Sequence, residues 1–219
     1  MSKYLLLALL FLLAAAALAP AYAENFPPPG TTPFSMSVSV QMHLYDESGQ
    51  YVLWYMDNAA GTSSLWHGAV QVNGSGYRYI DTSITTLTAT GALYDGYNVY
   101  RGPATVTTAA SAPGRMTSYG YPEGDFPAES FFDVFTEISA SAIGDLSTAA
   151  AVHLAGGAQS FSNHYAAGGA VSLYSGGSYV GDLTMLELRF TPIPEPSSLL
   201  ALGSGLLPLG FALRRRIKR

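Results

Sequence analysis

Strict alternation of apolar and polar residues is the clearest pattern in the middle of the chain. Every second residue from Phe34 to Leu44 is Phe, Met, Val or Leu, and the residues between them are Ser, Gln or His. Successive side chains of a strand point to opposite faces, so this period of two predicts a strand with one buried face and one polar face.

Nine further runs rich in β-branched and aromatic residues follow, separated by turn-forming pairs such as Asp57-Asn58 and Pro113-Gly114. Short strands at this spacing are typical of antiparallel β domains. We therefore expect a mainly β chain with one antiparallel, sandwich-like domain of about ten strands over residues 34–190. Residues 24–33 contain three consecutive prolines and are expected as an extended lead-in outside the fold. The further runs are Gln50–Met56, Leu65–Val72, Tyr77–Asp81, Ser83–Thr90, Tyr97–Tyr100, Ala104–Thr108, Ala149–Leu154, Ala170–Tyr174 and Tyr179–Phe190.

The segment Glu129–Ile138 leaves two interpretations open. Its apolar residues also fit one face of a short helix, whereas its aromatic and β-branched content favours a strand. We favour the strand and keep the short helix as the alternative.

Residues 1–23 have the three parts of a secretory signal peptide. Lys3 supplies the positive charge, Tyr4–Leu18 forms an apolar run, and small residues at Ala21 and Ala23 form the cleavage site. We expect the Sec translocon to export the chain and signal peptidase to cut after Ala23, so that the mature protein begins at Glu24. An uncleaved membrane anchor is the alternative.

Residues 192–219 contain three parts in a fixed order. The motif Pro194-Glu195-Pro196 comes first, a largely apolar and uncharged stretch over residues 197–213 follows, and basic residues end the chain. The apolar stretch is at the short limit for a membrane-spanning helix, and the positive charges favour the cytoplasmic side. We therefore expect a transient inner-membrane helix that leaves the domain outside. The basic residues are Arg214, Arg215, Arg216, Lys218 and Arg219.

This tail resembles the PEP-CTERM sorting signal of exported proteins of Gram-negative bacteria, because motif, apolar helix and arginine cluster occur together in that order. The resemblance covers only about 28 residues at one end of the chain. It implies processing close to Pro194-Glu195-Pro196 by an exosortase, a membrane-embedded cysteine transpeptidase. Bacteria that carry this signal often make extracellular polysaccharide.

Charge is distributed unevenly along the chain. Residues 24–190 hold four arginines, no lysine and fourteen of the fifteen carboxylates, a formal charge of −10. Such a domain is repelled by phosphate backbones, so we do not expect nucleic acid as a partner. The chain has no cysteine, which excludes disulfides, thiolate-bound metals and thiol nucleophiles.

The sequence patterns of the domain that could indicate catalysis do not meet the requirements of known catalytic sites. Glu129, Asp133 and Glu137 are spaced by four, which on a strand separates neighbouring positions by about 13 Å. Glycoside hydrolysis uses two carboxyls roughly 5–9.5 Å apart. Residues four apart would lie within that range only on a helix, where neighbouring positions are about 6 Å apart. No G-x-S-x-G elbow is present, and the four histidines lack metal-binding spacing. We therefore expect neither a catalytic site nor a resident cofactor, although Asp57-Asn58 and Asp95-Gly96 offer the oxygen ligands that calcium takes.

Aromatic residues give the last indication of function. Tyr77 and Tyr79 alternate with Arg78 and Ile80, so one aromatic face is expected there, and exposed tyrosine rings stack on sugars. We regard these two tyrosines as candidate glycan contacts. Trp54 and Trp66 are expected to pack in the core.

Together these features predict a non-enzymatic exported protein. It would pass through an inner-membrane intermediate to the cell surface or the extracellular matrix. Its role would be structural or adhesive, in contact with exopolysaccharide or a biofilm. Two alternatives are a secreted glycan-active enzyme similar to a glycoside hydrolase and a calcium-stabilised carbohydrate-binding module.

We predict that Glu195→Ala, or deletion of residues 214–219, leaves the full-length precursor in the inner membrane. The two prolines keep the motif extended, and Glu195 is the only charge between Arg189 and Arg214, so its loss removes the feature that a protease-like groove recognises. Mass measurement of the exported protein checks this. Normal processing of either variant would contradict the sorting assignment.

Overall fold

The computed structural model describes residues 25–46, 48–119, 124–158 and 163–193. Within these residues the chain forms thirteen strands, and no helix among them has the length and apolarity to cross a membrane. The predicted signal peptide with Ala21, Ala23 and Glu24 lies outside the described residues, as does the sorting signal from Pro194 onward.

The strands follow one another with short connections. In chain order they are β1 (Gly30–Tyr45), β2 (Tyr51–His67), β3 (Gln71–Val72), β4 (Arg78–Asp95), β5 (Tyr100–Thr108), β6 (Ala112–Ser118), β7 (Ala128–Val134), β8 (Thr136–Ala140), β9 (Gly144–Thr148), β10 (Val152–Ala158), β11 (Asn163–Ala167), β12 (Val171–Ser175) and β13 (Ser178–Pro192).

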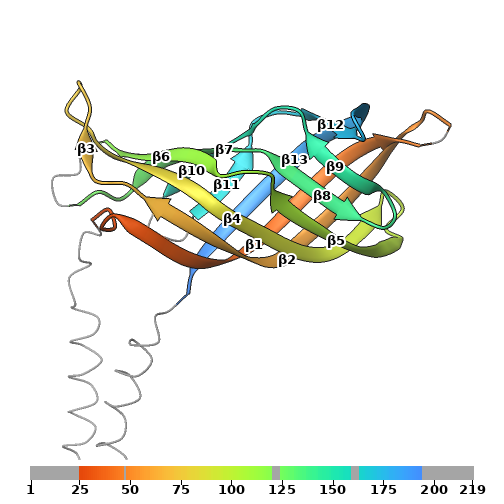
Figure 1. The fold of residues 1–219 in the computed structure, drawn as a ribbon, viewed down its shortest axis with the longest axis horizontal. Coiled ribbons are helices and arrows are strands. Elements are labelled where there is room, and N and C mark those ends of the chain that lie inside the picture. Colours follow the sequence, from red (N-terminus) through yellow and green to blue (C-terminus); the bar gives the residue numbers. More distant parts are fainter. Residues whose placement is uncertain (1–24, 47, 120–123, 159–162, 194–219) are drawn as a thin grey trace, which may run out of the picture.

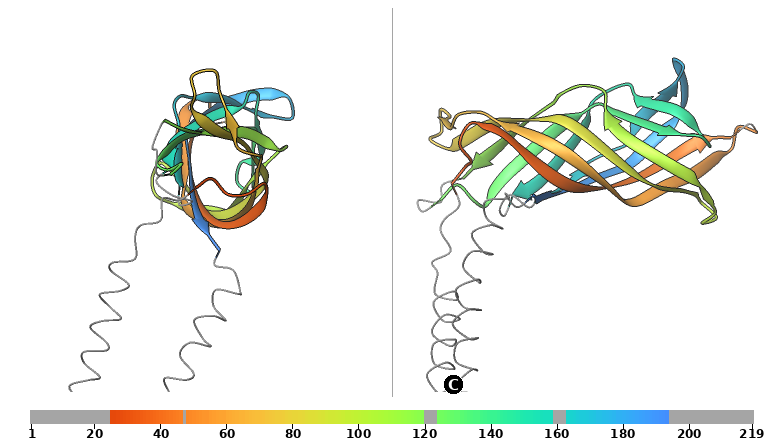
Figure 2. Two further views of the ribbon diagram at one scale, coloured as in Figure 1. Left: turned by 90° about the vertical axis from the view of Figure 1, so that its left-hand side faces the viewer. Right: turned by 60° about the horizontal axis from the view of Figure 1, so that its bottom comes forward.

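All of these strands belong to one antiparallel sheet that closes on itself (Figure 1). The closing contact is between the first and last long strands, where the register of β1 and β13 runs from Phe34 opposite Pro192 to Leu44 opposite Gly181. Viewed along its length, the sheet forms a ring (Figure 2). The prediction of a mainly antiparallel β domain is confirmed. The more detailed expectation of two packed sheets in a sandwich is not confirmed, because a single sheet surrounds the core.

Neighbouring short strands are halves of longer bent strands. β5 and β6 both pair with β4, one after the other, and β7 leads into β8 with only Phe135 between them. In the same way β9 continues into β10 and β11 into β12, so the sheet is an eight-stranded up-and-down circuit. One of the four breaks between these half-strands falls at Phe135. The other three fall at short runs of small residues, which are Ala109–Ser111, Ala149–Ala151 and Gly168–Ala170.

The inner face of the circuit is the hydrophobic core. The six apolar residues of the Phe34–Leu44 alternation are all buried, as predicted, and the residues between them face outward. The rings of Phe132 and Tyr165 lie 5.0 Å apart, and Phe34 and Phe190 pack edge to face at 5.9 Å. The hydroxyl of Tyr165 lies 2.8 Å from the Ser130 Oγ, which satisfies a polar atom inside the core.

One end of the circuit, here called the near end, carries the start of β1 and the end of β13, and the segment before β1 packs on the core there. Phe26 is buried there against Phe126, with ring centroids 5.6 Å apart. Its backbone N–H donates to the buried Asp125 carboxylate at 2.8 Å, and Arg78 pairs with the same carboxylate at 3.0 Å. The predicted lead-in therefore takes part in the fold, because burying Phe26 removes a large apolar ring from water. Figure 2 shows this segment crossing the ring.

The segment from Glu129 to Ile138 is extended, divided between β7 and β8, so the strand interpretation is confirmed over the short helix. Asp57-Asn58, predicted as a turn, lies inside the long strand β2. Asn58 adopts a positive φ of 51° at an irregularity in the pairing with β1, and its N–H donates to the Ser39 Oγ at 3.2 Å. A bulge of this kind inserts a residue without ending the strand. The predicted runs on either side therefore merge into one strand.

His67 belongs to this interior rather than to a surface site. Its side chain is fully buried on β2, and burial lowers its pKa to about 4. The ring is therefore neutral at physiological pH, as expected for a core histidine.

Phe132→Ala is expected to destabilise the protein by about 3–5 kcal/mol, because it leaves a cavity where a fully buried ring packs. Phe135→Ala is the matched control, since that ring is 41% exposed at the break between β7 and β8 and its loss should cost under about 1 kcal/mol. Urea unfolding followed by circular dichroism measures both. Equal losses in the two variants would contradict the assignment of Phe132 to the core.

Candidate functional site

The two tyrosines predicted as glycan contacts lie at the near end and face other side chains. The Tyr77 ring packs against Tyr119 with centroids 5.0 Å apart. The Tyr79 hydroxyl donates to Gln71 at 2.8 Å, and the Arg115 guanidinium lies over the Tyr79 ring at 4.3 Å. Tyr77 remains 37% exposed, whereas Tyr79 is half-buried.

Their partners Tyr119 and Arg115 line a groove of about 540 Å³ on the outer face of β6, β7 and β10. Arg115 reaches into it while its guanidinium is held by Asp81 at 2.8 Å. His153 borders it as well, and its Nδ1 lies 2.7 Å from Asp133. The groove is lined by Arg115, Thr117, Tyr119, Glu129, Ser130, Phe131, His153, Ala155, Gly156 and Gly157.

The carboxylates of this region do not form the pair that glycoside hydrolysis needs. Glu129 and Asp133 lie on the same strand, β7, four residues apart and therefore about 13 Å from each other. Glu137 lies on β8 and borders a different hollow. No cluster of three or more potential metal ligands occurs in the part of the chain that the structure describes.

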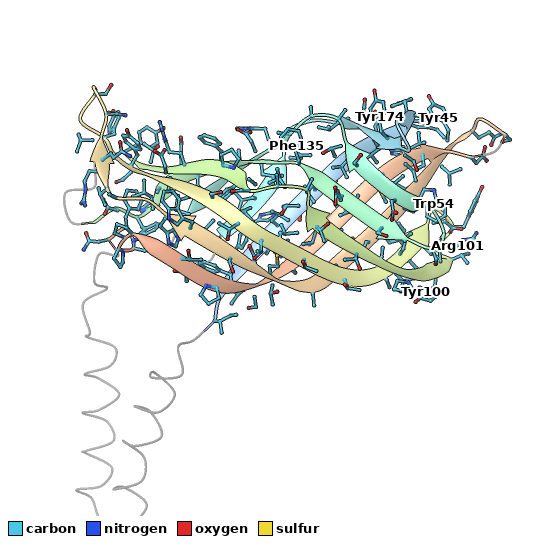
Figure 3. The ribbon with its side chains drawn as sticks, viewed as in Figure 1. Tyr45, Trp54, Tyr100, Arg101, Phe135 and Tyr174 are labelled. Atoms are coloured by element: carbon cyan, nitrogen blue, oxygen red, sulfur yellow. The ribbon has the colours of Figure 1, made fainter. Side chains whose placement is uncertain are left out.

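The opposite end of the circuit, the far end, carries a denser group of aromatic side chains on its outer face. Here β1 ends at Tyr45 opposite Tyr51 of β2, and Tyr179 of β13 lies on the other side of β1. The Tyr45 ring lies 4.6 Å from Tyr51 and 6.0 Å from Tyr179, measured between centroids. We call this group the tyrosine surface; it consists of His43, Tyr45, Tyr51, Tyr174, Tyr179 and Asp182. Tyr45 and Tyr174 are labelled at this end in Figure 3.

Asp182 holds the tyrosine surface together. The hydroxyls of Tyr51 and Tyr179 both donate to its Oδ2, the latter at 3.0 Å, and the Ser172 hydroxyl donates to its Oδ1 at 3.2 Å. The hydrogen bond to Asp182 raises the pKa of the Tyr51 hydroxyl well above its usual value near 10. The same bond lowers the pKa of the Asp182 carboxyl, so Asp182 is ionised across the physiological range.

A glycine next to Asp182 allows these groups to meet. Gly181 faces Leu44 across the β1–β13 ladder, and a Cβ at this position would lie 2.0 Å from the backbone oxygen of His43. Only glycine therefore lets β13 approach β1 this closely. His43 then stacks in parallel on Tyr51, with ring centroids 5.4 Å apart, beside Asp182.

A hollow of about 330 Å³ adjoins the tyrosine surface at the mouth of the far end. Trp54 lies in its wall, half-buried against the core, and Tyr45 and Asp46 lie at its rim. The expectation that Trp54 packs on the core is therefore confirmed. Trp66, also predicted as a core residue, is instead 42% exposed, because Leu65 takes the inward position next to it.

A second set of tyrosines extends the aromatic area around the far end. Tyr94 stacks on Tyr55 at 5.5 Å and meets Tyr100 at 5.9 Å. The turn beside them is fixed by Asp95, whose carboxylate accepts hydrogen bonds from both the Nε and a terminal nitrogen of Arg101. Burial alone would raise the pKa of Asp95, but hydrogen bonds from the Val99 N–H and Arg101 lower it overall. This carboxylate, considered above as a calcium ligand, thus has a cationic partner within the chain.

Sequence reasoning missed the tyrosine surface because its residues are far apart in the sequence. Tyr45 and Tyr179 are separated by more than half the chain and become neighbours only through the closing ladder of β1 and β13. One local signal was available, since Tyr45 and Tyr51 flank a single short connection between two predicted strands.

Asp182→Asn is expected to return the pKa of Tyr51 toward its usual value near 10, because the variant removes the negative acceptor that stabilises the protonated hydroxyl. Titration of isotope-labelled tyrosines by NMR measures this directly. Asp57→Asn, which neutralises an exposed carboxylate on the same strand as Tyr51, is the control and should leave the titration unchanged. An identical Tyr51 titration in wild type and Asp182→Asn would contradict the hydrogen-bond assignment.

No protein-family model and no curated protein matches this chain significantly. Among solved structures the chain is similar to DynF from the dynemicin biosynthesis pathway of Micromonospora chersina, with a TM-score of 0.59 and 14% sequence identity. The match covers 83% of this chain and 89% of that chain. At this level of identity the likeness shows a common fold and carries no statement about activity.

Proposed function

We propose that this chain is an exported protein of the cell surface or extracellular matrix that holds polysaccharide at its far end. The observation that carries the proposal is the tyrosine surface beside the Trp54 hollow. Its rings are exposed but fixed by hydrogen bonds and ring contacts, with Tyr45 at 50% and Tyr179 at 44% exposure. Rigid aromatic rings with polar edges offer contact area at low entropic cost, which suits a ligand that has both apolar faces and hydroxyl groups.

The route to that location is proposed from the two ends of the sequence. Residues 1–23 would direct export through the Sec translocon and be removed by signal peptidase. Residues 192–219 would hold the chain in the inner membrane until an exosortase acts near Pro194-Glu195-Pro196. The protein would then be structural or adhesive, without an enzymatic activity of its own.

The arrangement of the strands supports this role. Phe34 pairs with Pro192, so the chain enters and leaves the folded domain at the near end, while the tyrosine surface lies at the far end. The fifteen residues of β13 between them span roughly 35–40 Å along the axis of a closed sheet with tilted strands. A domain attached through the segment after residue 193 would therefore present its tyrosines away from the attachment.

The double variant Tyr45→Ala/Tyr179→Ala is expected to weaken binding to polysaccharide by about 5- to 140-fold, because each aromatic contact contributes about 0.5–1.5 kcal/mol. Co-sedimentation with insoluble polysaccharides and a glycan array measure the loss, using protein purified from cells that export it. Tyr77→Ala/Tyr119→Ala at the near end is the matched control and should bind as wild type does.

Two outcomes would contradict the proposal. Absence of binding to any polysaccharide would remove the function itself. Loss of binding in the near-end variant alone would instead assign polysaccharide binding to the groove around Arg115.

A further inference from the structure

Asp182 is a carboxylate that keeps its charge in the middle of an aromatic surface. Its hydrogen bonds come from the neutral hydroxyls of Tyr51, Tyr179 and Ser172, and none of these neutralises it. Asp46, at the rim of the adjoining hollow, is similar, since its carboxylate accepts the Ser48 hydroxyl at 2.6 Å and backbone N–H groups. The far end therefore presents negative charge next to exposed rings.

The cations of the domain are engaged elsewhere. Each of the four arginines within the described residues pairs with another carboxylate, and the sequence has no lysine between Lys3 and Lys218. His43, stacked on Tyr51, is the one basic side chain of the tyrosine surface. The arginine pairs are Arg78–Asp125, Arg101–Asp95, Arg115–Asp81 and Arg189–Glu187.

Building on the function proposed above, we propose that the tyrosine surface binds the ammonium groups of an amino-sugar polymer. Tyrosine ring faces attract cations, and an ammonium group donates charge-assisted hydrogen bonds to a carboxylate such as Asp182. The carbon–hydrogen faces of the sugars pack on the remaining ring area. A polyanionic polymer is repelled by the same charges.

A basic peptide is the competing cation, and the closed sheet disfavours it. Extended peptides commonly bind by adding a strand to a free sheet edge. Here β1 and β13 pair with each other along the tyrosine surface, so both strands already have partners on both sides. What remains there is side-chain surface, which favours a ligand recognised by its rings, amines and hydroxyls rather than by main-chain hydrogen bonds.

Isothermal titration of the purified exported protein with four hexamers tests the proposal. The ligands are glucosamine hexamer, N-acetylglucosamine hexamer, cellohexaose and hexalysine, at a mildly acidic pH at which the sugar amines are protonated. We expect the glucosamine hexamer to bind about tenfold more tightly than the two neutral sugars, because its ammonium groups add both a cation–aromatic contact and a charge-assisted hydrogen bond to Asp182. Added salt should reduce that preference by screening the charges.

Asp182→Asn should remove the preference for the glucosamine hexamer while leaving affinity for the neutral sugars within about twofold, because the charge is lost while the side-chain size and one acceptor oxygen remain. Tyr51→Phe keeps the ring and the carboxylate and should retain the preference. Asp145→Asn neutralises a carboxylate of β9, hydrogen-bonded to Ser139 and outside the tyrosine surface, and is the matched control.

The outcomes separate this proposal from the general function. Equal affinity for charged and neutral hexamers overturns the amino-sugar assignment but leaves polysaccharide binding intact. Binding of hexalysine without binding of the glucosamine hexamer overturns it in favour of a basic peptide. Failure of all three sugars to bind overturns the amino-sugar assignment, while the glycan array described above decides the general function.

Discussion

The hydrogen-bond ladder between β1 and β13 is the contact on which the rest of the molecule depends. It joins the first and last long strands along their length, from Phe34 opposite Pro192 to Leu44 opposite Gly181. Because this ladder closes the sheet, β1 and β13 have no free edge and one face of the strands in the circuit is turned inward. The filled interior, the two distinct ends and the meeting of distant tyrosines all follow from that closure.

The local strands were predictable, and their closure was not. The alternation of apolar and polar residues in Phe34–Leu44 identifies the inward residues of β1 correctly, because successive side chains of a strand point to opposite faces. The prediction of a turn at Asp57-Asn58 is wrong, because the same residue types occur in turns and in bulges. Only the pairing of β2 with β1 distinguishes the two. Phe26 was assigned outside the fold, because nothing near it in the sequence reveals the buried Asp125 that receives its N–H.

The candidate site was less predictable for the same reason. Tyr77 and Tyr79 are recognisable because they lie two residues apart in the sequence, and they contact Tyr119 and Arg115, which line a groove. Tyr45, Tyr51 and Tyr179 form a denser surface, but their proximity depends on register across three strands. The inward side chains fill the core, so the outer face and the mouth are where this fold offers groups for recognition.

The positions of residues 25 and 193 at one end, and of the tyrosine surface at the other, have a mechanical consequence. A load between a polymer held at the far end and an attachment after residue 193 would run along the length of β13. Hydrogen bonds of an antiparallel ladder lie perpendicular to the strands, so this load shears the ladders that join β13 to β1, β11 and β12. Many bonds then share the force and must break together rather than one after another. A circuit loaded in this way would resist stretching along its axis.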